Sequence, residues 1–189
     1  ILGGAVLSSQ KFITDHLMNF MRHTGPAMSA FNAWILLKGL ETLPLRVEAQ
    51  RRTAVRVADS LADHPTVTRV LYPFRDDHPQ AGLARQQMRG GGTIVSFEVA
   101  GGKAGAFAVL NALGLIDISN NLGDTKSLIT HPASSTHRSM SLEARDQIGV
   151  TDSLIRLSVG LEDTDDLIED LLGAMQHAAC GGSSAAGGA

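Results

Sequence analysis

The chain has 189 residues, and its 16 lysines and arginines against 19 aspartates and glutamates give a formal net charge of −3. Its 43% apolar residues suit one folded domain, or one domain with part of a neighbour, while 4% aromatic residues and a slightly acidic balance exclude the basic, ring-rich surface of a nucleic-acid-binding protein. With one cysteine, Cys180, and no apolar run near the ~18–20 residues that cross a bilayer, the chain forms no intramolecular disulfide framework and is expected to be cytoplasmic.

The N-terminal residues predict a buried strand followed by a helix. Residues 1–8 are apolar and contain two glycines, which is typical of a short buried strand with a close backbone approach. Residues 10–21 suit a helix, broken at Gly25 and Pro26, with four partly buried side chains: Phe12, His16, Met18 and Phe20. The chain begins at Ile1 without an initiator methionine, cap or turn, so we expect it to be part of a longer protein whose preceding part holds some of the chemistry.

A long helical pattern follows at residues 29–62. Pro44 removes a backbone hydrogen bond and is expected to bend this single helix. Glu48 precedes Arg51 and Arg52 by three and four positions, the spacing of exposed ion pairs. Apolar residues recur at helical spacing along one face: Phe31, Trp34, Ile35, Leu37, Leu40, Val47, Ala54, Ala58 and Leu61.

The rest of the chain alternates between strand and helix patterns. Strands are predicted by alternating apolar and polar residues at 66–72, 93–99, 115–119, 126–130 and 153–159. Helices are predicted between them, at 80–88, after Gly101 and Gly102, after the cap Ser141, and after the cap Asp163. This order indicates an α/β or α+β domain with a small mixed or antiparallel sheet covered by helices.

Arg156 is the most pointed candidate for a functional residue. It lies in the middle of the strand predicted at 153–159, and the opposite face of that strand is apolar. A guanidinium in this position must meet water or an anion, and it binds a carboxylate or phosphate through two parallel hydrogen bonds. From the pattern alone, a surface or structural ion pair is the more common reason for such an arginine.

The segment GDTKSLITHPASSTH, residues 123–137, is the second candidate. It gathers hydroxyl groups, two histidines and Lys126 around the end of a predicted strand, where binding sites commonly lie. A capped, hydrogen-bonded turn is the structural alternative. His131 and His137 lack the spacing of a metal-binding framework, so no metal is expected.

Five separated blocks of the sequence, in the same order, resemble the C-terminal part of the pyridoxal-phosphate-dependent enzymes of cysteine and methionine metabolism, the cystathionine synthase and lyase family. The blocks are LGGAVL, GPAMSAFNAWILLKGLETLPLR, VTRVLYPFRDDHPQ, ISNNLGDTKSLITHPASSTH and SLIRLSVGLEDTDDLIEDL. The resemblance covers residues 1–177. Within the family, these sequence blocks are most similar to those of the O-succinylhomoserine sulfhydrylases.

The resemblance implies an aminotransferase-like architecture of fold type I. Residues 1–28 are then a remnant of the large cofactor-binding domain, and residues 29–62 form the long helix that connects it to the small domain. Residues 63–177 form that small C-terminal α/β domain, and residues 178–189 form a flexible tail rich in small residues.

The resemblance also implies roles for four residues. Arg156 matches the arginine that binds the α-carboxylate of the amino-acid substrate. Ser127 matches the serine beside the substrate and the imine of the cofactor, with its main chain helping to place the amino group. Lys126 stands where family members differ, and we expect it to help select the γ-substituent. Thr130 completes the expected substrate-binding set.

The implied reaction is γ-replacement, in which sulfide replaces the succinate group of O-succinylhomoserine to give homocysteine in methionine biosynthesis, with pyridoxal 5'-phosphate as cofactor. The Schiff-base lysine lies upstream in the family, and none of Lys11, Lys38, Lys103 and Lys126 has its sequence context. We therefore expect the chain alone to be inactive, with no catalytic residue of its own.

The expected partners are small-molecule substrates and, for the full-length enzyme, other copies in a homotetramer; no nucleic acid or membrane is expected. Three alternatives stay open. The chain could come from a methionine γ-lyase or from a cystathionine γ-synthase, since these relatives share the arginine that matches Arg156 and the Thr-His-Pro motif of residues 130–132. It could also be a non-catalytic interaction module that keeps the small-domain fold.

Overall fold

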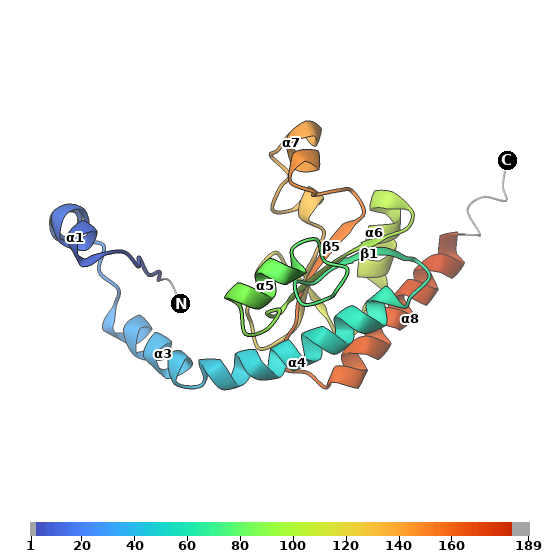
Figure 1. Ribbon diagram of the computed structural model, residues 1–189, viewed down its shortest axis with the longest axis horizontal. Helices are drawn as coiled ribbons and strands as arrows, with labels where there is room; N and C mark the ends of the chain where they lie inside the picture. The colour runs from blue at the N-terminus through green and yellow to red at the C-terminus, as the bar shows by residue number, and fades with distance from the viewer. Residues whose placement is uncertain (1–2, 183–189) are drawn as a thin grey trace. The chain divides into compact units, whose positions relative to one another are not determined.

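The computed structural model describes residues 3–182 and divides the chain into two compact units (Figure 1). The first unit is Ile1–Leu45 and the second is Arg46–Ala189, so the boundary falls inside the region expected to be one connecting helix. The division at residues 28 and 62 stays a prediction. No helix in residues 3–182 combines the length and apolar character needed to cross a bilayer.

The first unit consists of helices. Helix α1 (Gln10–Phe12), a π-helical turn (Ile13–Leu17) and α2 (Met18–Thr24) follow one another without a gap, and α3 spans Ala30–Glu41. Gly25 ends α2 with a left-handed φ of 69°, a conformation that glycine adopts without steric cost, so the predicted break is confirmed.

Two expectations for the first unit are wrong. Residues 3–9 form no strand and are exposed, because the described part of this unit offers no neighbouring strand; Ile1 and Leu2 lie outside the described residues. The helical side chains expected to be partly buried are exposed, with Phe20 at 60%. In fact none of residues 3–45 is buried, since helices without a second layer leave their apolar faces in solvent.

The single bent helix expected at residues 29–62 is two helices. Helix α3 ends at Glu41, and α4 (Leu43–Ala62) begins after Thr42. Pro44 is the second residue of α4, where its missing N–H is not needed, so it starts a helix rather than bending one. The predicted ion pair is present, with Arg51 Nη2 and Glu48 Oε1 separated by 2.6 Å.

A mixed sheet of five strands forms the centre of the second unit. The strand order is β1-β2-β5-β4-β3, and all neighbours are antiparallel except β3 and β4, which are parallel. The strands are β1 (Val67–Leu71), β2 (Ile94–Val99), β3 (Asp117–Ile118), β4 (Leu128–Thr130) and β5 (Leu154–Ser158). All lie within predicted strands, so the expected mixed α/β sheet is confirmed.

Helices and turns connect these strands. They are α5 (Ala81–Gln87), α6 (Gly102–Ala112), a 3₁₀ turn (Pro132–Ser134), α7 (Leu142–Gln147) and α8 (Thr164–Gly182). Asp163 caps α8 as predicted, because its Oδ1 accepts hydrogen bonds from the amides of Asp165 and Asp166. Helix α8 continues to Gly182, so residues 178–182 are helical rather than part of a tail; residues 183–189 lie outside the described residues.

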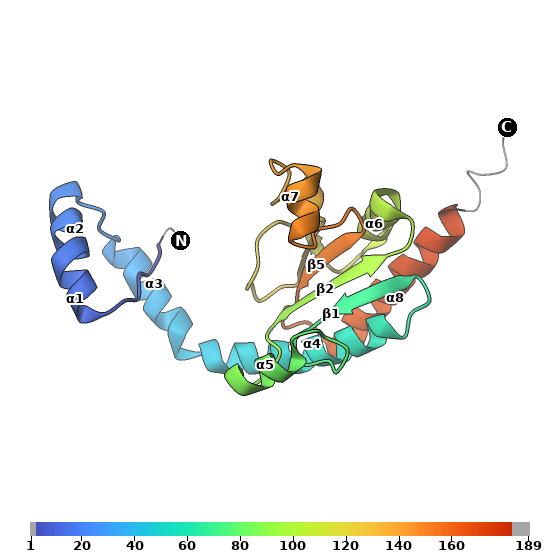
Figure 2. The same cartoon turned by 45° about the horizontal axis from the view of Figure 1, so that its top comes forward.

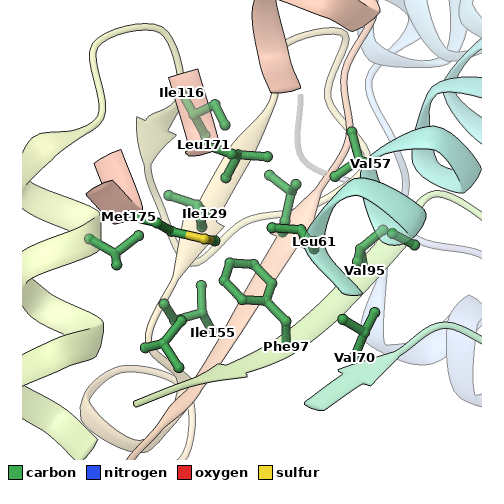
Figure 3. Packing of buried hydrophobic residues seen from close by; sticks show 14 of the residues in the cluster. Val57, Leu61, Val70, Val95, Phe97, Ile116, Ile129, Ile155, Leu171 and Met175 are labelled. Atoms are coloured by element: carbon green, nitrogen blue, oxygen red, sulfur yellow. The ribbon is translucent and has the colours of Figure 1, made fainter. Parts of the chain in front are cut away.

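The hydrophobic core lies between one face of the sheet and helices α4, α6 and α8 (Figure 2). Alternate residues of β2 and β5 supply the strand side of this core. Figure 3 shows side chains from helices and strands, among them Leu61 and Met175, gathered around Phe97. Burying an apolar side chain of this size stabilises the fold by about 1.5–3 kcal/mol.

The opposite face of the sheet is more polar and holds a smaller apolar cluster of Ala133, Val150 and Leu154. Strand β5 alternates between the two faces: Ile155 and Leu157 point into the core, and Arg156 and Ser158 point to the polar face. The fold thereby places the guanidinium of Arg156 on the face that the three core helices leave open.

Candidate functional site

Arg156 occupies the centre of β5 and has a neighbour on each side. It pairs with Ser96 of β2 and with Thr130 of β4 in the register of the sheet. Opposed residues in adjacent strands project to the same face. The polar face therefore carries a row of Ser96, Arg156 and Thr130, with the arginine in the middle.

The guanidinium of Arg156 is only partly satisfied. Its Nη2 donates hydrogen bonds to the carbonyl oxygens of Asn120 at 2.8 Å and Asn121 at 3.1 Å. Its Nε is the single buried side-chain nitrogen or oxygen in residues 3–182 that has no hydrogen-bond partner. Such an orphaned donor is costly to bury, and a ligand that accepts a hydrogen bond relieves the cost.

The charge of Arg156 is also uncompensated. Burial lowers the pKa of its guanidinium, which nevertheless stays protonated at neutral pH because the ordinary pKa of arginine lies far above neutrality. Within the described chain, the ion pairs formed by arginines do not include Arg156. A partly buried cation with neutral partners and a free donor is suited to an anionic ligand such as a carboxylate.

Residues 119–127, which we call the strap, run along β5 and its extension. The Gly123 amide donates to Ser158 Oγ at 2.9 Å, and the Leu161 amide donates to the Thr125 carbonyl at 2.7 Å. These bonds add to those between Arg156 and the two asparagine carbonyls. The strap thus holds backbone acceptors against the guanidinium.

Gln50 joins helix α4 to the strap. Its Nε2 donates to the Asp124 carbonyl at 2.7 Å and to the Val159 carbonyl at 2.9 Å, and the residue is 5% exposed. The sequence interpretation missed Gln50. Its signal was present, because a glutamine on the apolar face of a helix needs a buried hydrogen-bond partner.

Ser127 lies where the strap turns into β4 and is 1% exposed. Its amide donates to Glu162 Oε1 at 2.5 Å, its hydroxyl donates to Glu162 Oε2 at 2.8 Å, and its Oγ accepts from the Gly160 amide at 2.8 Å. Glu162 was also missed by the sequence interpretation, since an acidic residue after a strand normally indicates only a solvated loop.

Lys126 and Thr130 flank this turn in different environments. Lys126 is exposed, and its Nζ lies 2.5 Å from Asp117 Oδ2; this hydrogen bond raises the pKa of Lys126. Thr130 is buried, and its Oγ1 lies 2.8 Å from Ser135 Oγ. Of the four predicted site residues, the sheet places Arg156 and Thr130 directly beside each other, and Ser127 and Lys126 precede the same strand β4.

The lysines and histidines were the other candidates for chemistry. Each lysine has a partner: Lys11 pairs with Asp15, Lys38 with Glu41 and Lys126 with Asp117, and Lys103 lies over the ring of Phe107. Among residues 3–182, no group of three or more histidine, cysteine or acidic residues could hold a metal ion. Both ring nitrogens of the buried His131 are engaged, by Ser134 Oγ and the Asp152 carbonyl.

Known proteins are similar in sequence to this chain. The sequence pattern of the Cys/Met metabolism PLP-dependent enzymes matches residues 1–176. The chain is 56% identical over 177 residues to an O-succinylhomoserine sulfhydrylase from Mycobacterium tuberculosis, covering 90% of this chain and 43% of that protein. It is 44% identical over 168 residues to an O-succinylhomoserine sulfhydrylase from Pseudomonas aeruginosa, covering 89% of this chain and 42% of that protein. The chain thus spans less than half the length of these curated relatives.

A solved structure agrees at the level of the fold. It is that of a Campylobacter jejuni protein described as an O-acetylhomoserine (thiol)-lyase, and it carries a pyridoxyl-lysine group. The TM-score is 0.84 at 37% identity, over 90% of this chain and 41% of that chain. The expected architecture of fold type I is therefore confirmed, and the chain belongs to the Cys/Met metabolism family of pyridoxal-phosphate-dependent enzymes.

Proposed function

We propose that the chain is the part of an O-succinylhomoserine sulfhydrylase that binds the α-carboxylate of the amino-acid substrate. The observation that carries the proposal is Arg156, a partly buried cation with two carbonyl partners and one unpartnered donor. A carboxylate presents two acceptor oxygens that match the planar fork of a guanidinium. The 56% identity to a sulfhydrylase supports the choice of substrate.

Enzymes of this family use pyridoxal phosphate, which, when bound, supplies an electron-withdrawing ring for reactions of amino acids. The described residues fit the carboxylate end of such a site, because Arg156 has a free donor. They do not fit the covalent anchor of the cofactor, because all four lysines are exposed and none has the sequence context of the family's cofactor-binding lysine. We therefore place the cofactor's lysine in another part of the longer protein and expect this chain alone to be inactive.

Arg156 binds and orients in this proposal. Its unpartnered Nε donates to a carboxylate oxygen, while the strap carbonyls keep Nη2 in place. Because β5 is paired on both sides, the arginine is attached to a rigid element. Fixing one end of the substrate in this way aligns its reacting bonds and lowers the entropic part of the barrier.

Lys126 helps to select the γ-substituent in the same proposal. A succinyl group carries a second carboxylate, and Lys126 offers an exposed ammonium at the strap turn. The ion pair with Asp117 keeps this ammonium in one orientation and competes with the substrate for it. Thr130, at the end of β4, borders Arg156 in the sheet, and Ser127, just before β4, holds the strap in place.

The remaining expectations concern the longer protein. We expect it to use sulfide as nucleophile, to release succinate and homocysteine, and to act in methionine biosynthesis as a cytoplasmic homotetramer. The high identity to two sulfhydrylases supports the reaction. Quantifying products with sulfide, cysteine or methionine as co-substrate tests it: cystathionine as main product, or methanethiol released from methionine, contradicts it in favour of a γ-synthase or a γ-lyase.

The decisive variants are made in the complete enzyme that contains this chain. Arg156→Ala is expected to lower kcat/KM for O-succinylhomoserine about 100-fold, because the charge-assisted hydrogen bonding to the carboxylate is lost. Arg156→Lys, which keeps the charge without the fork, is expected to lose about tenfold. The exposed Arg89→Ala is the matched control and should match the wild type. An unchanged kcat/KM in Arg156→Ala contradicts the proposal.

The inactivity of the chain alone is tested by adding pyridoxal phosphate to the 189-residue protein, followed by borohydride reduction and peptide mapping. We expect no stoichiometric adduct at any of its four lysines. A stoichiometric adduct at one of them contradicts the placement of the cofactor's lysine outside this chain.

A further inference from the structure

We propose that Glu162 is a positioning residue for Arg156. By holding Ser127, Glu162 fixes one end of the strap, and the other end of the strap holds the guanidinium. This inference rests on the proposed carboxylate binding by Arg156, and it assigns the orientation of that arginine to a carboxylate that does not itself contact it.

The carboxylate of Glu162 is used entirely by Ser127. One oxygen accepts from the Ser127 amide and the other from the Ser127 hydroxyl, at 2.5 and 2.8 Å. Within residues 3–182 no cation forms an ion pair with Glu162. Burying a carboxylate without a cation is unfavourable unless hydrogen bonds replace its lost hydration. The two bonds from Ser127 are the ones that do so here.

The arrangement depends on a glycine at position 160. A Cβ atom at Gly160 would lie 2.3 Å from Glu162 Oε2 and 2.4 Å from the Ser127 amide nitrogen. The Gly160 amide also donates to Ser127 Oγ at 2.8 Å. A side chain is therefore excluded at this position, and the three residues form one closely packed unit.

The hydrogen-bond donors of Ser127 are already used within the protein. Its amide hydrogen and hydroxyl hydrogen are both donated to Glu162, and its carbonyl accepts from the Asp117 amide at 3.3 Å. The serine is therefore better placed to anchor the strap than to donate to a substrate carboxylate. This explains why a serine beside the site is 1% exposed.

The strap connects this anchor to Arg156 through an ordered series of bonds. From the Ser127 end, Thr125 bonds to Leu161 and Gly123 bonds to Ser158. The carbonyls of Asn120 and Asn121 then bond to Arg156. Strap and β5 run in the same direction along these contacts, so a shift at Ser127 moves the acceptors that hold the guanidinium.

The test uses the complete enzyme and the substitution Glu162→Gln. This change keeps the size of the side chain but turns one acceptor into a donor that faces a Ser127 hydrogen. Glu169→Gln, at an exposed position of α8, is the matched control. Calorimetry measures the binding of L-norleucine, which has an α-carboxylate and no leaving group, and of L-norleucinamide, which lacks the carboxylate.

We expect Glu162→Gln to weaken L-norleucine binding about tenfold and to leave L-norleucinamide binding unchanged, because only the carboxylate meets Arg156. We expect Glu162→Asp, which keeps the charge but shortens the reach, to lose about threefold. The value of KM should rise more than kcat falls. The control should match the wild type.

A double-mutant cycle separates positioning from general stability. In an Arg156→Ala background, Glu162→Gln should no longer affect L-norleucine binding, because the group it positions is absent. An equal effect in both backgrounds, or an equal effect on both ligands, overturns the role of Glu162 and leaves carboxylate binding by Arg156 intact. If Arg156→Ala alone leaves L-norleucine binding unchanged, the proposed function itself fails.

Discussion

The two units of the chain carry similar helical patterns but bury very different amounts of them. In residues 3–45 no residue is buried, although phenylalanine, methionine, leucine and tryptophan recur at helical spacing. In the second unit, helices with comparable patterns cover a sheet and enclose a continuous core. The difference shows that an amphipathic pattern provides a face for packing, and that burial requires a second layer on which to pack.

The largest expected effect compares one phenylalanine from each unit. Phe97→Ala removes a ring that is 0% exposed, and we expect it to lower the free energy of unfolding by about 3–5 kcal/mol. Phe31→Ala removes a ring that is 65% exposed and should change it by less than about 0.5 kcal/mol. Urea unfolding of the 189-residue chain measures both. Equal losses would show that residues 3–45 have a core of their own.

A pair of glutamines tests the same comparison with a smaller expected change in the free energy of unfolding. Gln50→Ala leaves the Asp124 and Val159 carbonyls without their donor, and we expect a loss of about 1–3 kcal/mol. Gln10→Ala removes an exposed bond to Thr14 in the first unit and should cost less than about 0.5 kcal/mol. Thermal unfolding monitored by circular dichroism compares them. A larger loss for Gln10→Ala contradicts the assignment of Gln50 as a buried bridge.

Two serine caps should behave alike in both units. Ser29 accepts from the Asn32 amide at the start of α3, and Ser141 accepts from the Ala144 amide at the start of α7. Because capping is local, we expect Ser29→Ala and Ser141→Ala each to cost about 1 kcal/mol. Amide hydrogen exchange in the first turn of each helix reports the loss. Faster exchange in only one of the two helices would show that capping depends on the surrounding layer.

The smallest expected effect is electrostatic and belongs to the second unit. A hydrogen bond from Arg75 lowers the pKa of Asp77, which is exposed. Since the folded pKa lies below the unfolded one, this contribution is present above the unfolded pKa and disappears as the pH falls through the folded pKa. After solvent screening, Asp77→Asn should remove less than about 0.5 kcal/mol of acid-dependent stability. Urea unfolding at neutral and acidic pH measures the free energy of unfolding of both proteins. A variant that loses more of it on acidification than the wild type would contradict the prediction.

Much of the second unit follows from local sequence patterns. Alternation at residues 94–99 and 154–158 predicts β2 and β5, because one face of each strand is buried. The caps Ser141 and Asp163 mark the starts of α7 and α8 for the same local reason. The strand expected at residues 1–8 was wrong because strand formation depends on a neighbour that the local pattern does not specify.

From the residue pattern alone, the candidate site could be predicted only where a residue contradicts its own surroundings. Arg156 was found because a cation interrupts an apolar strand. Glu162 and Asn121 were missed because they act on groups 35 residues away, through contacts that leave no periodic signal. The strap similarly depends on backbone carbonyls, which any residue type supplies.

The central claim is that the unpartnered Nε of Arg156 receives the substrate carboxylate. A crystal structure of the complete enzyme with L-norleucine tests this most directly. We predict a carboxylate oxygen about 3 Å from Arg156 Nε, with the Asn120 and Asn121 carbonyls still on Nη2. A carboxylate bound elsewhere, with Arg156 Nε still unpartnered, would contradict the claim.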